Sequence, residues 1–176
     1  MVWSLSRFAE DYRPGEEFEL GSRLVTREEL IEFARKYDPF PFHLDDKAAQ
    51  ATPFGGIVAS GWMTALVWLK LMHETLLDPA MVLGSPGHEE MNWPTPVKPG
   101  DMLSGRVTIK ESRLSKSKPE MGFVRYTAKL HNQREECVFV TTSTLIVRTR
   151  KVRLIGGFTL GRTRSAFGRP QGTPYR

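Results

Sequence analysis

With 176 residues, of which 40% are apolar and 10% aromatic, the chain is expected to form one globular domain with its own core. Its single cysteine, Cys137, excludes an intramolecular disulfide framework, and the apolar run at 61–72 is too short to span a bilayer and contains Lys70. The net charge of +5 is unevenly divided, because 17 basic and 20 acidic residues precede Arg148, whereas eight basic and no acidic residues follow from that position.

The first half of the chain predicts mainly helices. A weak alternation of apolar residues over 18–25 indicates a strand. Thr26, followed three residues later by Glu29, is the signature of a capping box, and apolar residues at helical spacing continue until Pro39 ends the helix. A short helix is expected over 46–51. The longest helix is expected over 61–77, and because it is apolar on almost every side we expect a sheet to bury it completely.

The second half of the chain changes to a period of two. Alternation over 103–109 and 124–130, and a β-branched run over 138–147, predict long antiparallel strands, with a hairpin turn at 132–135. Helices followed by a meander of strands indicate an α+β fold, in which one helix packs against a curved sheet.

The predicted domain covers residues 1–150. The basic Gly-, Arg- and Pro-rich segment 151–176 is expected to be an extended or poorly ordered tail. Because this tail lacks a dense basic run and aromatic stacking platforms, we expect no nucleic-acid partner. The N-terminal residues show no signal-peptide pattern, so we expect a cytoplasmic protein without a membrane partner.

Asp38 and His43 are the main candidates for catalysis. Pro39 and Pro41 bias the residues before them away from helical backbone, so we expect a stiff, non-helical loop. A carboxylate and an imidazole on such a loop can hold a water molecule between two groups that transfer protons. The alternative is structural: Asp38 would only end a helix, and His43 would be a packed ring among phenylalanines.

Four motifs in chain order resemble those of MaoC-like dehydratases, the hot-dog fold family that includes the (R)-specific enoyl-CoA hydratases. They are Asp-Pro-Phe-Pro-Phe-His-Leu-Asp at 38–45, Phe-Gly-Gly-Ile-Val-Ala-Ser-Gly-Trp-Met-Thr at 54–64, Trp-Pro-Thr-Pro-Val-Lys-Pro-Gly-Asp-Met-Leu at 93–103, and Asn-Gln-Arg at 132–134. The resemblance covers about residues 18–150. It implies a hot-dog fold, in which a curved antiparallel sheet wraps a long buried helix, and a homodimer or a higher homo-oligomer.

By the same resemblance, Asp38 and His43 form the catalytic pair, and the backbone N–H of Gly61 faces the thioester oxygen. The implied reaction is hydration of a trans-2-enoyl-CoA to the (3R)-3-hydroxyacyl-CoA, or the reverse dehydration. Coenzyme A is then the carrier of the acyl-CoA substrate, and no cofactor is bound for the chemistry. Two positions depart from the family pattern: Phe40 stands where Asn is common, and Ser60 stands where His is common. We expect neither to touch the catalytic pair, but both should alter the walls of the pocket.

Further residues are expected to bind substrate. These are Phe42, Ser60, Trp62 and Trp93 around the acyl group, and Lys116 and Lys118 for the phosphates of coenzyme A. Each has a simpler alternative: Ser60 can be a helix cap, Gly61 can serve close packing, the tryptophans can be core residues, and the lysine pair can be a solvated turn. The histidines have no partners at metal-ligand spacing, so we expect no metal site.

Two other functions stay open from the sequence. One is a hot-dog acyl-CoA thioesterase, which would hydrolyse the same thioester. The other is a non-catalytic acyl-CoA-binding module that keeps the pocket without turnover.

Overall fold

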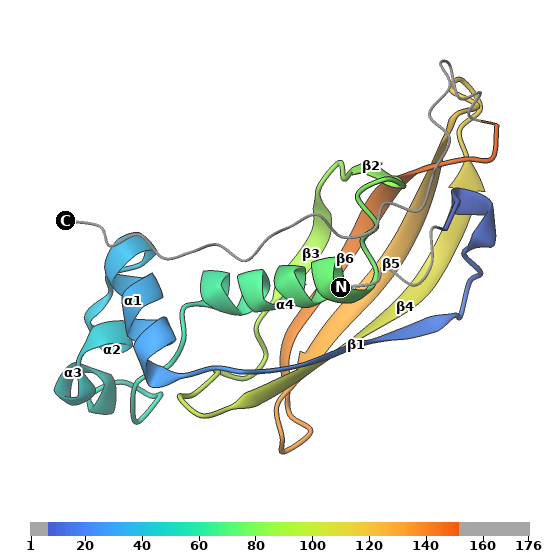
Figure 1. Ribbon diagram of the computed structural model, residues 1–176. Helices are drawn as coiled ribbons and strands as arrows, with labels where there is room; N and C mark the ends of the chain where they lie inside the picture. The colour runs from blue at the N-terminus through green and yellow to red at the C-terminus, as the bar shows by residue number, and fades with distance from the viewer. Residues whose placement is uncertain (1–6, 152–176) are drawn as a thin grey trace, which may run out of the picture.

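A curved antiparallel sheet wraps one side of a long helix in the computed structural model, which describes residues 7–151 (Figure 1). The helices are the 3₁₀ turn η1 (Ala9–Asp11), α1 (Arg27–Tyr37), α2 (Pro41–Leu44), α3 (Asp46–Gln50) and α4 (Gly61–Thr75). The strands are β1 (Glu17–Leu24), β2 (Val82–Gly84), β3 (His88–Asn92), β4 (Met102–Leu114), β5 (Met121–His131) and β6 (Cys137–Arg148). Neighbouring strands follow the order β1-β4-β5-β6-β2, and β3 also pairs with β6.

The core lies between α4 and the inner face of the sheet. Trp68 of α4 is buried, and its ring lies 5.6 Å from the ring of Phe139 on β6 and 6.5 Å from that of Tyr126 on β5. Along β4, buried residues such as Val107 alternate with exposed ones, so only one face of the sheet contributes to the core. This is the predicted α+β hot-dog arrangement, which is confirmed.

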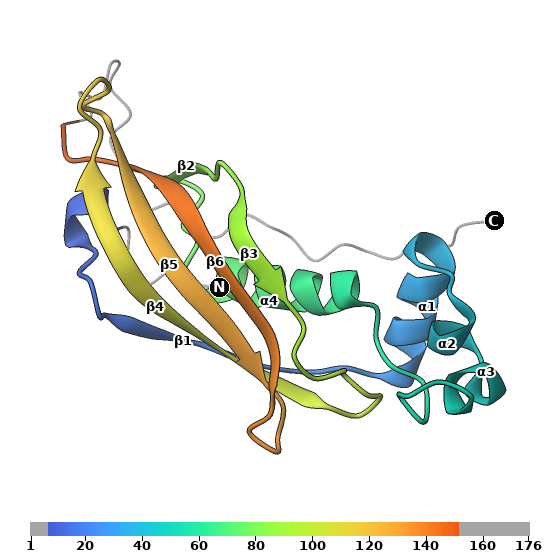
Figure 2. The same ribbon diagram turned by 180° about the vertical axis from the view of Figure 1, so that it is seen from behind.

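Helices α1, α2 and α3 gather beyond one end of the sheet, next to the start of α4 (Figures 1 and 2). The predicted capping box of α1 is present: Thr26 Oγ1 accepts a hydrogen bond from Glu29 N–H at 3.2 Å, and the Glu29 carboxylate accepts one from Thr26 N–H at 3.5 Å. The entry into α1 is therefore fixed by local sequence, and α1 in turn places Asp38 at its other end.

The prediction that the stretch around Asp38 and His43 is non-helical is wrong for its second half. Residues Pro41–Leu44 form the one-turn helix α2, in which Asp45 N–H donates to the carbonyl of Pro41 at 2.9 Å. Pro41 takes the first helical position, where the missing N–H has no intrahelical acceptor in any case. Phe40 keeps the extended backbone that is expected before a proline.

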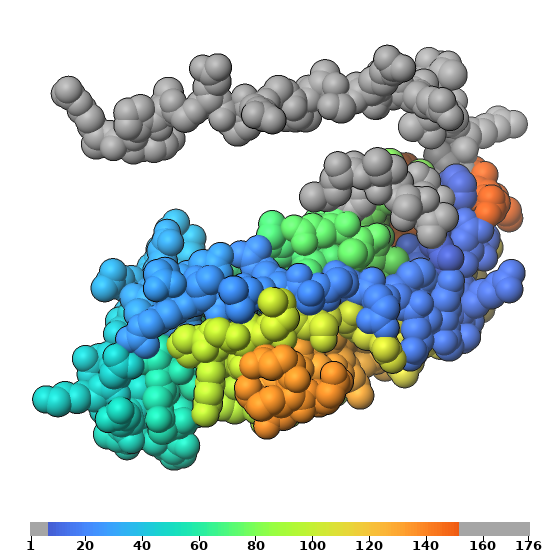
Figure 3. All heavy atoms as spheres, turned by 60° about the horizontal axis from the view of Figure 1, so that its bottom comes forward, coloured from blue at the N-terminus to red at the C-terminus, as the bar shows by residue number. Residues whose placement is uncertain are grey.

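The prediction that the longest helix is buried on every side is also wrong. Trp62 is 62% exposed and Leu66 is 51% exposed, and Lys70 and His73 continue the same uncovered strip along α4. Figure 3 shows atoms of α4 at the surface above β1. The sheet curls around only part of the helix, so one apolar strip has no covering element among the described residues.

Two short strands, β2 and β3, were not predicted. Gly84, Pro86 and Gly87 interrupt this region, and the sequence of β3, His-Glu-Glu-Met-Asn, has neither β-branched residues nor apolar alternation. Pairing with β6, which does carry a strong strand signal, places both segments in the sheet.

Some predictions concern residues outside the described part of the chain. Of the predicted tail at 151–176, only Lys151 is described, and residues 1–6 of the predicted domain are also outside. Among residues 7–151, no helix has the length and apolar character that crossing a membrane requires.

Gly122 of β5 generates a stability prediction, because it lies against η1. A Cβ at this position would be 2.3 Å from the Cβ of Ala9 and 3.2 Å from the carbonyl oxygen of Arg113. Neither atom is the end of a flexible side chain, so we expect Gly122→Ala to lower the free energy of unfolding in urea by about 1–3 kcal/mol. The control is Gly56→Ala, because a Cβ at Gly56 has no neighbour within 4 Å. Equal unfolding midpoints for the two variants would contradict the close approach of η1 and β5.

Candidate active site

Asp38 and His43 lie side by side at the end of the molecule that α1, α2 and α3 form. Asp38 is the C-cap of α1, where its N–H donates to the carbonyl of Ala34 at 2.9 Å and its backbone turns out of the helix with φ −151° and ψ 66°. His43 is the third residue of α2. Its Nε2 lies 3.5 Å from Asp38 Oδ2, and the side chains of His43 and Asp38 are 7% and 19% exposed. The structure therefore brings the predicted pair together in a largely buried position.

A backbone carbonyl fixes the orientation of the His43 ring. The ring atom Nδ1 lies 2.7 Å from the carbonyl oxygen of Val58. Because a carbonyl only accepts hydrogen bonds, Nδ1 carries the hydrogen, and in the neutral ring the lone pair lies on Nε2. Phe42 supports the imidazole by an edge-to-face contact, with 4.4 Å between the ring centroids. In the neutral ring, the nitrogen that faces Asp38 is thus a hydrogen-bond acceptor.

Ser60 connects Asp38 to the start of α4. Its hydroxyl donates to Asp38 Oδ2 at 2.6 Å, and its Oγ accepts from Trp62 N–H at 3.2 Å. Ser60 is thereby the N-cap of α4, which agrees with the simpler of its two predicted roles. Ser60 is fully buried in the single chain, and its contact with substrate stays a prediction.

Gly61 begins α4 with a free amide. Among the hydrogen bonds of the described residues, none uses Gly61 N–H, which is expected for the first residue of a helix. On its carbonyl side, Trp93 Nε1 donates to Gly61 O at 2.8 Å, and a Cβ at Gly61 would lie 3.0 Å from the indole ring. The glycine therefore permits the close approach of Trp93 and leaves an N–H donor beside Ser60.

The arrangement can bind and polarise a water molecule. An ionised Asp38 and a neutral His43 are both acceptors, so together they can take both hydrogens of a water while its lone pairs stay free to attack. The start of α4 carries a partial positive charge that suits a developing oxyanion. Among residues 7–151, no three His, Cys, Asp or Glu side chains gather in a way that could hold a metal ion.

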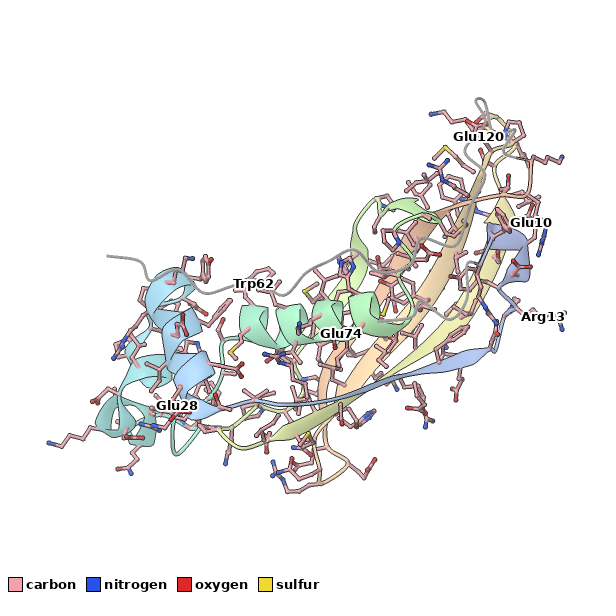
Figure 4. All side chains as sticks on the ribbon, in the orientation of Figure 1. Glu10, Arg13, Glu28, Trp62, Glu74 and Glu120 are labelled. Carbon is pink, nitrogen blue, oxygen red and sulfur yellow. The ribbon has the colours of Figure 1, made fainter. Side chains whose placement is uncertain are left out.

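Phe42 adjoins His43 in the chain, and Trp62 follows Gly61 at the start of α4. Phe42 packs against Phe40 and Phe54, with ring centroids 5.4 and 5.6 Å apart. Trp62 is exposed near the end of α4 that adjoins α1 (Figure 4), and its ring meets that of Trp93 at 5.9 Å. The rings of Trp62 and Trp93 therefore lie over the first turn of α4.

Lys116 and Lys118 are not brought to the pair within one chain. They lie exposed in the turn between β4 and β5, which carries the labelled Glu120 at the far end of the sheet from α1, α2 and α3 (Figure 4). Their binding of coenzyme A phosphates stays a prediction.

Two surface hollows lie elsewhere. One, of about 330 Å³, runs between α1 and α4 and is lined by Phe33, Tyr37 and Leu66 among others. The other, of about 440 Å³, is polar and lies on the outer face of β1, β4 and β5. Neither is lined by Asp38 or His43, so a single chain leaves the pair outside both hollows.

The sequence did not reveal two contacts that organise the site. The carbonyl of Val58 comes from the backbone, which has no residue-specific signal. The hydrogen bond from Ser60 to Asp38 joins positions 22 apart in the chain. The prediction that Ser60, as a departure from the family pattern, would not touch the pair is wrong, because its hydroxyl binds Asp38.

The tautomer of His43 is a direct test of this geometry. In protein labelled with ¹⁵N-histidine, at a pH where His43 is neutral, we expect ring nitrogen shifts of the Nδ1–H tautomer. The His43→Gln variant assigns the signals among the four histidines. Finding the Nε2–H tautomer would mean that the bond to Val58 is absent.

Comparison with known proteins supports the resemblance read from the sequence. The profile of the family described as "MaoC like domain" matches residues 9–131. A MaoC-like dehydratase from Rhodospirillum rubrum is 35% identical, with a TM-score of 0.78 over 84% of this chain and 100% of that one. The unliganded (R)-hydratase PhaJ1 from Pseudomonas aeruginosa, 21% identical over 88% of this chain and 96% of that one, has a TM-score of 0.66 and shows a shared fold.

The chain is also similar in sequence to a curated relative. The uncharacterized protein YdeM from Bacillus subtilis is 25% identical over 139 residues, which are 79% of this chain and 97% of YdeM. The matched profile spans most of the chain and includes Asp38, His43 and Gly61. The chain belongs to the MaoC-like domain family of hot-dog proteins.

Proposed function

We propose that the protein is a hydro-lyase that adds water across the double bond of a trans-2-enoyl-CoA thioester, or removes it from the (3R)-3-hydroxyacyl-CoA. The observation that carries this proposal is the meeting of Asp38 and His43, with His43 Nε2 held as an acceptor 3.5 Å from Asp38 Oδ2 by the bond to Val58. Family membership supports the reaction type, since the matched structures include a MaoC-like dehydratase and an (R)-hydratase.

In this proposal the pair activates a bound water. Asp38 accepts one proton of the water as its oxygen bonds to C3, and the electron pair of the C2=C3 bond moves to give an enolate at the thioester oxygen. Gly61 N–H stabilises that oxygen, and a proton delivered by the pair then forms the C2–H bond. General acid–base catalysis of this kind contributes roughly 10²–10⁴-fold, and an oxyanion donor about 10²–10³-fold.

The substrate follows from the same reasoning. An enolate oxygen needs a carbonyl that accepts charge, and a thioester provides one. Coenzyme A is the carrier that the family resemblance implies, and it is not a cofactor of the chemistry. Trp93 and Trp62 lie at the first turn of α4, and we expect them to contact the acyl group.

The central test is Asp38→Asn, measured by the loss of enoyl absorbance over a panel of trans-2-enoyl-CoA thioesters of increasing acyl length. We expect the variant to lose about 10²–10⁴-fold in kcat, because the carboxylate that accepts the proton is gone. The matched control is Asp46→Asn, which removes an exposed carboxylate paired with Arg27 at the surface and should keep the wild-type rate.

Three outcomes would contradict the hydratase. Equal turnover by Asp38→Asn and wild type would exclude the proposed base. Release of free thiol without loss of the enoyl absorbance would identify a thioesterase. Binding of the thioesters without any turnover by the wild type would indicate a binding module.

The uncovered strip of α4 supports a homodimer as the working form. Trp62 and Leu66, together with the 62% exposed Tyr37 at the end of α1, put large apolar side chains on one side of the molecule. Aromatic residues are enriched at protein interfaces, and contiguous apolar surface marks such sites.

Leu66→Asp tests this surface by light scattering. The wild type should have the mass of two chains, and the variant should shift toward one, because a carboxylate would be buried in the interface. Leu114→Asp, at a 42% exposed leucine that ends β4, is the control and should leave the mass unchanged. A monomeric wild type, or equal masses for both variants, would contradict the assignment of the strip.

A further inference from the structure

The hydrogen bond from Ser60 to Asp38 has a consequence for the reaction. We infer that Ser60 is a positioning residue: it occupies Asp38 Oδ2 and thereby leaves Oδ1 as the oxygen that takes the proton of the water. The inference deepens the proposed function and rests on it, because the water and its two acceptors are those of the proposed hydration.

Asp38 Oδ2 already accepts a short hydrogen bond from the protein. Ser60 Oγ lies 2.6 Å away, a distance typical of a hydroxyl that donates to a carboxylate. Ser60 Oγ itself accepts from Trp62 N–H at 3.2 Å. A directed row of donors thus runs from the start of α4 through Ser60 to Oδ2. Because Ser60 is fully buried, water does not compete with its hydroxyl for this position.

The distance between His43 Nε2 and Asp38 Oδ2 also indicates that Oδ1 is the oxygen that binds the water. A water that donates one hydrogen to each of two acceptors at about 2.8 Å holds them about 4.5 Å apart, because its two O–H bonds diverge at a near-tetrahedral angle. His43 Nε2 and Asp38 Oδ2 are only 3.5 Å apart, which is too close for that bridge. Oδ1, the other oxygen of the same carboxylate, is free of the bond to Ser60. It is the acceptor that can share a water with Nε2.

Loss of the hydroxyl would misplace the base without removing it. The carboxylate of Asp38 would be free to rotate, and Oδ2 would need another donor. Gly61 follows Ser60 in the chain, and its N–H has no acceptor among the described residues. The carboxylate of Asp38 would therefore compete with the thioester oxygen for this N–H. Ser60→Ala should therefore lower kcat by about 10–100-fold while KM changes by about twofold or less, because misplacement of reacting groups acts on the chemical step.

A double-mutant cycle separates this role from simple capping of α4. In the Asp38→Asn background, Ser60→Ala should have no further effect on the residual rate, because Ser60 acts through the carboxylate. Ser60→Thr, which keeps a hydroxyl, should recover most of the wild-type kcat. The control is Thr26→Ala, which removes the N-cap of α1 and should cost similar stability, about 1 kcal/mol, with kcat unchanged.

The inference would be overturned by a Ser60→Ala variant that loses stability as Thr26→Ala does but keeps its kcat, or by an equal fall in rate in the Asp38→Asn background. A crystal structure of the substrate-free protein tests it independently of turnover. A water bridging Oδ1 and His43 Nε2 in the wild type, with a rotated carboxylate in Ser60→Ala, supports it, and a water on Oδ2 refutes it. If the wild type hydrates no enoyl thioester, the proposed function fails, and this crystallographic comparison still decides the role of Ser60.

Discussion

The candidate site depends on the short backbone segment from Val58 to Gly61. The carbonyl of Val58 orients His43, the hydroxyl of Ser60 holds Asp38, and the amide of Gly61 begins α4. Between them, Ala59 donates its N–H to the carbonyl of Val97 at 2.8 Å, which ties the segment to the chain that leads into β4. One stretch of backbone therefore sets the acid, the base and the helix terminus in place relative to each other.

This arrangement gives the Asp38 carboxylate fewer hydrogen-bond donors than it can accept from. A carboxylate that is largely removed from water must be compensated by donors. Ser60 supplies one, but a neutral His43 supplies none from Nε2, because the bond to Val58 puts its one ring hydrogen on Nδ1. A water molecule is the ligand that meets the needs of both groups, since it offers two hydrogens to two acceptors. With a neutral His43, the pair therefore suits a bound water between its two acceptors.

The sequence predicted those parts of the molecule that local patterns determine. The capping box of Thr26, the alternation in β4 and β5, and the closeness of Asp38 to His43 all follow from neighbours in the chain. The sequence did not predict elements whose structure depends on a distant part of the chain: β3 is a strand only because it pairs with β6. It also failed for Pro41, since a proline that usually ends a helix can start one.

The prediction that α4 is buried on every side failed for another reason. The hydrophobicity of Trp62 and Leu66 favours their removal from water, but it does not show what would cover them. Periodicity alone led to a helix buried within its own chain, whereas the described residues leave that side open. Whether a side chain is covered by its own sheet or by a second copy is a property of the assembly, which a single sequence does not encode as a pattern.

Gly61 shows how packing and chemistry coincide in this fold. The sequence left two explanations open, close packing or a donor for the oxyanion, and the structure contains the basis of both. The absence of a Cβ lets the Trp93 ring reach the first turn of α4, and the bond from Trp93 Nε1 to the Gly61 carbonyl holds that turn from one side. The N–H of the same residue, which lies beside Ser60, has no acceptor among residues 7–151. Because a larger residue would displace Trp93 and so move the turn that carries this amide, the packing requirement is itself part of how the donor is positioned.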